Sequence, residues 1–129
     1  MKFLLDTNAV IALLKAHPSF RERLQRYQPQ DFGISSIVAH ELFFGAYKSQ
    51  NAAANLARIE GLRFEILDFD REDARCAGEI RASLAKSGTP IGPLDVLIAG
   101  QALARALTLI THNRGEFDRV EGLKVEDWL

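Results

Sequence analysis

Three acidic residues, Asp6, Glu41 and Asp95, occur far apart in the chain, at positions where their carboxylates could form one site. Carboxylates that gather in one place repel each other, and they cannot all ionise cheaply without a shared cation. Mg²⁺ prefers hard oxygen ligands, and a bound ion can activate water and stabilise charge on a phosphate. If the fold brings the three acids together, the chemistry we expect is metal-assisted hydrolysis of a phosphodiester bond.

Each acid also has an ordinary structural explanation. Asp6 follows an apolar run and could cap a helix that begins near Ala9. Asp95 falls in the first turn of a helix opened by Gly92-Pro93, where a carboxylate gains roughly 0.3–1 kcal/mol. Glu41 lies in a helix that is apolar nearly all round, so we expect it to be buried and to need a buried Arg or a metal ion as partner.

A second polar cluster follows the apolar run 107–110. Thr111 and Asn113 could orient a bound water or a ligand carboxylate, and Glu116 is a further acid. A polar loop with a helix cap is the simpler interpretation of His112 and Arg114 taken singly.

The elements that must position these residues alternate between strands and helices. Short apolar runs predict strands at 3–5, 32–34, 64–67, 107–110 and 123–125. Helical periodicity and capping residues predict helices at 9–14, 20–27, 36–49, 51–61, 70–86 and 93–106, with Gly88 ending the fifth. This order favours one α/β domain over residues 1–129, with a mostly parallel sheet of four to five strands. Sites in such sheets lie beyond the carboxyl ends of the strands, which is where the polar residues fall.

Composition narrows the class of protein. The chain has 129 residues, 47% of them hydrophobic, which suits one globular core. Its net charge of −1 argues against a nucleic-acid coating protein, so RNA contacts would need local cations. The candidates for phosphate contact are Arg81, Lys86, Arg105 and Arg114.

The single cysteine, Cys76, excludes a disulfide framework and a cysteine-rich zinc site within one chain. Asp6 interrupts the first apolar residues, and no run approaches 18 apolar residues. We therefore expect a cytoplasmic protein with no membrane segment.

Four motifs in order resemble those of the PIN-domain ribonucleases, and within them the VapC-like toxins of bacterial toxin–antitoxin pairs. They are Leu4–Asn8, Ser35–Gly45, Gly88–Asp95, and a fourth region formed by Leu109–Asn113 and Val125–Trp128. The resemblance spans essentially the whole chain. It implies a three-layer α/β/α sandwich and a metal-dependent endoribonuclease.

The resemblance also implies roles for individual residues. Asp6, Glu41 and Asp95 would bind Mg²⁺ or Mn²⁺ and position the attacking water. Many members carry a fourth Asp after the last motif's strand, where this chain has Asn113; either Asn113 or Glu116 could complete the site, and Asn113 ranks first for proximity. The resemblance further implies a homodimer that is inhibited by a cognate antitoxin, and contact with operator DNA only through that antitoxin. The RNA substrate would be tRNA, with initiator tRNA the leading candidate.

Three alternatives remain at this point. A receiver domain would need paired acids after the first strand and a late Lys, which the chain lacks. A metal-independent ribonuclease could use His40 and His112 for general acid–base cleavage. A catalytically weakened RNA-binding module of the same fold is compatible with the departure at Asn113.

Overall fold

The computed structural model describes all residues, 1–129. Its strands are β1 (Phe3–Leu5), β2 (Phe32–Ser35), β3 (Glu65–Leu67), β4 (Thr108–Ile110) and β5 (Val125–Glu126). Its helices are α1 (Thr7–Leu14), α2 (Pro18–Leu24), α3 (Ser36–Lys48), α4 (Ala52–Glu60), α5 (Arg71–Lys86), α6 (Pro93–Ala104) and α7 (Arg114–Phe117), with one 3₁₀ turn at Pro29–Asp31. None of the helices is both long enough and apolar enough to cross a membrane.

The five strands form one sheet in the order β3-β2-β1-β4-β5. Every neighbouring pair is parallel, and the central strand aligns Leu5 with Ile34 of β2 on one side and with Ile110 of β4 on the other. All three residues of β1 are buried, as expected for a strand that is covered on both faces. The predicted α/β fold class is confirmed, with a sheet that is parallel throughout.

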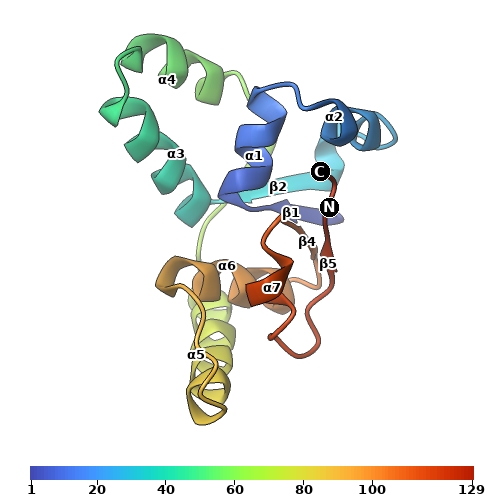
Figure 1. Ribbon diagram of the computed structural model, residues 1–129, viewed down its shortest axis with the longest axis vertical. Coiled ribbons are helices and arrows are strands. Elements are labelled where there is room, and N and C mark those ends of the chain that lie inside the picture. Colours follow the sequence, from blue (N-terminus) through green and yellow to red (C-terminus); the bar gives the residue numbers. More distant parts are fainter.

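The order of the strands assigns the helices to two layers. The chain steps outward from β1 to β2 and β3, then returns to β4 and β5 on the other side of β1. Because parallel crossovers are right-handed, this reversal sends α1–α4 to one face of the sheet and α5–α7 to the other. Figure 1 shows this three-layer arrangement, with the sheet between the two groups of helices. The residues that follow β1, β4 and β5 therefore lie along one edge of the sheet.

Local chemistry explains most of the helix boundaries. The Ser35 hydroxyl accepts a hydrogen bond from the backbone N–H of Ile37 at the start of α3. Asp70 and Asp73 form a reciprocal capping box at the start of α5, and Gly88 takes a φ of 67° just beyond its end, as predicted. The helix α6 ends earlier than expected because Ala106 takes a φ of 55°, which breaks the helical hydrogen-bond pattern.

The two helices on the second face, α5 and α6, pack closely along each other. A Cβ added to Gly100 would lie 2.6 Å from the Cα of Ala77, so this contact requires glycine. One helical turn before Ala77, the carboxylate of Asp73 is 1% exposed and accepts hydrogen bonds from Gln101 and Arg105, at 3.1 Å and 3.0 Å. The guanidinium group of Arg105 is thus already bound by Asp73, and its role in phosphate contact stays a prediction.

Candidate active site

Asp6 lies at the carboxyl end of β1 and is 4% exposed. Its Oδ1 atom accepts a hydrogen bond of 2.8 Å from the backbone N–H of Ala9, so it does cap α1. Burial raises the pKa of Asp6, and the charges of Glu41 and Asp127 raise it further, while hydrogen bonds from Thr111 and Ala9 act in the opposite direction. Asp6 therefore caps α1 and also belongs to a group of acids that interact electrostatically.

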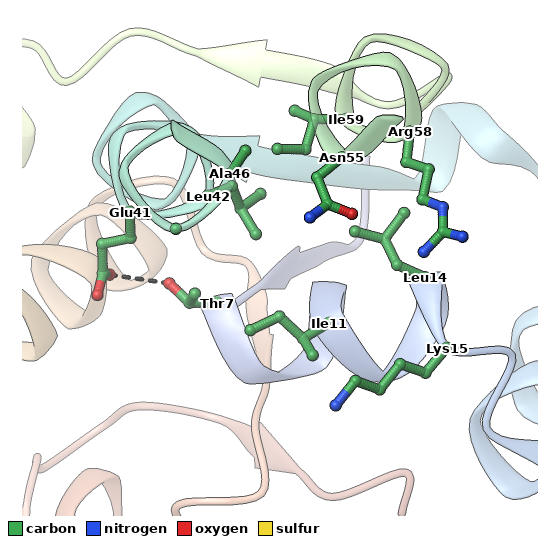
Figure 2. Close-up of a pocket in the computed structure, with 11 residues that line it drawn as sticks. Thr7, Ile11, Leu14, Lys15, Glu41, Leu42, Ala46, Asn55, Arg58 and Ile59 are labelled. Atoms are coloured by element: carbon green, nitrogen blue, oxygen red, sulfur yellow. Dashed lines mark hydrogen bonds between the residues drawn. The ribbon is translucent and has the colours of Figure 1, made fainter. Parts of the chain in front are cut away.

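Glu41 lies on α3, and its carboxylate turns toward the start of α1. The Thr7 hydroxyl donates a hydrogen bond of 2.8 Å to the Oε1 atom of Glu41 (Figure 2). The expected deep burial of Glu41 is wrong, because its side chain is only half-buried. The reason is that α3 buries one face only, while Phe44 and Tyr47 on the other face are 62% and 70% exposed. The partner of Glu41 is accordingly a hydroxyl group and not a buried arginine.

Asp95 lies in the first turn of α6, whose N-cap Gly92 offers no side chain. Burial raises the pKa of Asp95 to about 7, with further contributions from Glu116, which hydrogen-bonds to it, and from the charges of Asp6 and Glu41. A Cβ on Gly92 would lie 2.9 Å from the Oδ2 atom of Asp95, so a side chain at position 92 would require this carboxylate to shift. The structure thus brings all three predicted acids close enough to influence each other's charge.

Asn113 and Glu116, the two candidates for the fourth position, are hydrogen-bonded to each other. The Asn113 side-chain amide donates to the Oε2 atom of Glu116 at 2.8 Å, and the Asn113 backbone N–H donates to the Thr111 hydroxyl at 2.9 Å. The hydrogen bonds from Asp95 and Asn113 lower the pKa of Glu116, whereas the contact with Glu116 helps to raise the pKa of Asp95. Glu116 is therefore the group that reaches Asp95, and Asn113 holds Glu116 in place.

The sequence reasoning missed one acid near this group. Asp127 follows β5, and its charge contributes to the raised pKa of Asp6. Its Oδ2 atom lies 2.9 Å from the Nδ1 atom of His112. The rule that polar residues after parallel strands meet at one edge would have found Asp127 had it been applied to the last strand. The His112 contact also means that the structure pairs this histidine with Asp127 and not with His40, which is exposed on α3.

The donor atoms of this acidic cluster, which we define as Asp6, Glu41, Asp95 and Glu116, are of the kind that Mg²⁺ or Mn²⁺ binds. All are carboxylate oxygens, and burial, with a smaller contribution from the neighbouring acids, raises the pKa values of Asp6 and Asp95. As they stand, no three acidic, histidine or cysteine side chains form a ready-made metal-binding group. In this structure the Thr7 hydroxyl binds Glu41 and the backbone N–H of Ala9 binds Asp6. The donor chemistry of the acidic cluster fits a divalent cation.

The remaining predicted phosphate contacts, Arg114, Arg81 and Lys86, are all exposed. Arg114 lies 3.5 Å from Asp118, four residues along the chain, at a half-exposed site. Arg81 and Lys86 are exposed on α5, which extends away from α1 and α3 in Figure 1. Phosphate contact by these two residues stays a prediction.

Comparisons with known proteins agree with this geometry. Residues 3–123 match the model of the PIN domain family. A curated relative from Shigella flexneri, the tRNA(fMet)-specific endonuclease VapC, is 48% identical over 99% of this chain and 98% of its own length.

Solved structures give the same result. The crystal structure of DNA-bound VapBC from Salmonella typhimurium superimposes with a TM-score of 0.94 and 45% identity, covering 100% of this chain and 99% of that chain. A member of the VapBC family of toxin–antitoxin systems from Mycobacterium tuberculosis has a TM-score of 0.74 and 27% identity, covering 98% of this chain and 96% of that chain. The chain therefore belongs to the PIN-domain family, and within it to the VapC-like ribonucleases of toxin–antitoxin pairs.

Proposed function

We propose that this protein is a Mg²⁺-dependent endoribonuclease in which Asp6, Glu41 and Asp95 hold the ion, with Mn²⁺ as an alternative. The observation that carries the proposal is the convergence of three carboxylates from separate elements, Asp6 after β1, Glu41 on α3 and Asp95 at the start of α6. Burial and the neighbouring acids raise the pKa of Asp95 to about 7, in agreement with this placement. Ionising a carboxylate beside other carboxylates costs free energy, and binding of a cation would explain why the fold keeps them together. When bound, the ion supplies positive charge that activates a water molecule and stabilises the charge developing on the phosphate.

The other residues of the site position these ligands. The Thr7 hydroxyl fixes one oxygen of Glu41, leaving the second oxygen for the ion. The buried Thr111 connects two elements, because it donates to Asp6 and accepts from the backbone of Asn113. Asn113 and Glu116 complete the site, with the Asn113 amide orienting the Glu116 carboxylate. Each acid is thus oriented by a neighbour before any ion binds.

The substrate we propose is tRNA, and initiator tRNA first. The support is the activity for which the Shigella flexneri relative is named, since that protein shares 48% identity over 99% of this chain. We further propose that residues 1–129 act as one PIN domain, as a homodimer in the cytoplasm, and as the toxin of a pair with a cognate antitoxin. Operator DNA would be contacted through the antitoxin, in keeping with the DNA-bound VapBC complex from Salmonella typhimurium.

The experiment is cleavage of total RNA and purified tRNA by the wild type, with Mg²⁺, with Mn²⁺, and with EDTA. We expect discrete cleavage with either metal and none with EDTA. Asp6→Asn should abolish cleavage, whereas the matched control Asp68→Asn, at an exposed side chain without a hydrogen bond, should cleave like the wild type.

Two outcomes would contradict the proposal. Cleavage that persists in EDTA or in Asp6→Asn would favour a metal-independent mechanism. A wild type that binds RNA but cleaves none, with either metal, would favour a catalytically weakened binding module.

A further inference from the structure

A groove leads away from the acidic cluster along one side of α1. Its first part is a cavity of about 300 Å³ between α1, α3 and α4 (Figure 2). Its second part is a shallower depression between the ends of α1 and α4. The two parts share Leu14, Lys15 and Arg58, so they form one continuous surface, which we call the α1–α4 groove.

One end of the α1–α4 groove opens onto the acidic cluster. Thr7 and Glu41, joined by their hydrogen bond, line the cavity at this end, as Figure 2 shows. A ligand in the groove would therefore lie directly beside the bond that is cleaved at the acidic cluster.

The other end of the groove is positively charged. Lys15, Arg58 and Arg63 line it, and all three are exposed. None of the three takes part in an ion pair or a side-chain hydrogen bond, whereas Arg23 and Arg105 are both bound by carboxylates. In a protein with a net charge of −1, these unneutralised cations favour an anionic occupant.

The middle of the groove is apolar with one polar group. Ile11, Leu42 and Ile59 line it, and the Asn55 side chain points into it from α4 (Figure 2). The Asn55 amide nitrogen donates to the Ser49 hydroxyl at 2.8 Å, which fixes the amide and leaves its oxygen free to accept. A cavity of this size lies at the lower end of the range for small-ligand sites, about 300–1,000 Å³. Apolar walls with one fixed acceptor suit a nucleobase, which has apolar faces and amino donors on its edge.

We propose that the α1–α4 groove binds the single-stranded RNA next to the cleaved bond, with one base in the cavity and phosphates at Lys15, Arg58 and Arg63. The inference rests on the proposed ribonuclease function. The eight residues of α1 span about 12 Å, at about 1.5 Å per residue. A stacked strand rises about 3.4 Å per nucleotide, so the groove holds about three nucleotides between the acids and the cations.

The test compares two variants that carry the same loss of charge. Lys15→Gln/Arg58→Gln removes two groove cations, and Lys2→Gln/Lys124→Gln removes two exposed cations that precede β1 and β5, at the opposite edge of the sheet. Binding of a short fluorescent single-stranded RNA is measured in EDTA over a salt series, and cleavage of a single-stranded RNA is measured with Mg²⁺. Melting temperatures establish that both variants are folded.

For single strands the slope of log K against log salt is about 0.7 per phosphate contact, so each lost contact weakens binding about fivefold at 0.1 M salt. We expect the groove variant to bind RNA roughly 25-fold more weakly, with its slope reduced by about 1.4. Its KM should rise by a similar factor with kcat little changed, and adding Arg63→Gln should extend the trend. The control variant should match the wild type.

Equal RNA binding and equal salt slopes in the two variants would overturn the inference. So would a groove variant that keeps wild-type KM but loses binding to the antitoxin, because the groove would then belong to a protein partner. A wild type that cleaves no RNA would instead overturn the proposed function, and the binding series in EDTA would still decide the role of the groove.

Discussion

Replacing Asp95 with asparagine should stabilise the metal-free protein at pH 8. The pKa of Asp95 is raised from 3.8 to about 7 in the folded protein, so the folded state holds a proton that the unfolded state releases. The stabilisation from that proton is fully present below pH 4 and is lost as the pH rises through about 7. Above this range wild-type Asp95 is ionised beside other carboxylates. The asparagine side chain of the variant would remain neutral there and could still donate a hydrogen bond to Glu116.

The size of the effect follows from the shift. About three pKa units correspond to a ceiling of about 4 kcal/mol at about 1.36 kcal/mol per unit. The side chain is only half-buried, so screening by solvent reduces this figure by about half. The opposite shift of Glu116 and the lost attraction of a carboxylate to the helix N-terminus, roughly 0.3–1 kcal/mol, reduce it further. We expect a net gain of about 1 kcal/mol, or about 3–5 °C in melting temperature for a chain of this length.

The assay is thermal unfolding of the wild type and Asp95→Asn at pH 5 and pH 8, in EDTA and then with saturating Mg²⁺. The variant should gain stability relative to the wild type between pH 5 and pH 8 in EDTA. Mg²⁺ should reverse the order, since a ligand at 100 times its Kd stabilises its folded receptor by about 2.7 kcal/mol. A variant that is less stable than the wild type at pH 8 in EDTA would refute the reasoning and favour the helix N-terminus as the reason for Asp95.

Three further substitutions test the frame around the site. Gly100→Ala should lower the melting temperature by roughly 6–12 °C, a loss of about 2–3 kcal/mol, because its Cβ would lie 2.6 Å from Ala77. The control Gly78→Ala has open space around it and should be neutral or slightly stabilising. Asp73→Asn should cost about 2–3 kcal/mol at pH 7 by urea unfolding, because it removes the buried charged partner of Arg105 and leaves only the exposed Asp70 to pair with it, and the difference should vanish as the pH falls through the lowered pKa of Asp73. Thr7→Val should weaken Mg²⁺ binding, measured by calorimetry, with little change in melting temperature, because it removes only the hydrogen bond to Glu41; unchanged Mg²⁺ affinity would exclude this role.

The order of the elements was predictable because each strand and helix carries a local signal. The apolar runs at 3–5 and 107–110 both form buried strands at the centre of the sheet, and the capping residues Ser35 and Asp70 stand where the helices α3 and α5 begin. The last strand shows where local signals fail. It comprises Val125 and Glu126 instead of 123–125, because its limits depend on pairing with β4 and not on its own residues.

Burial around Glu41 could not be predicted for a different reason. The sequence of α3 is apolar nearly all round, which is typical of a helix that is covered on every side. In this chain the helix is covered on one side only, and Phe44 and Tyr47 remain exposed on the other. The sequence states which residues are apolar, but contacts from distant elements decide which of them are covered.

Contacts from distant elements also decide which cations are paired. This explains how a chain with almost no net charge can bind RNA. Arg105 is separated from Asp73 by 32 residues, so nothing local distinguishes it from a free arginine such as Arg58. The fold pairs the first inside an interface and leaves the second beside a groove that ends at the acids. The 16 basic residues behind the net charge of −1 therefore include some that carboxylates already bind and a few that they do not. For RNA the second group matters, because only an unpaired cation gains a new partner when a phosphate arrives.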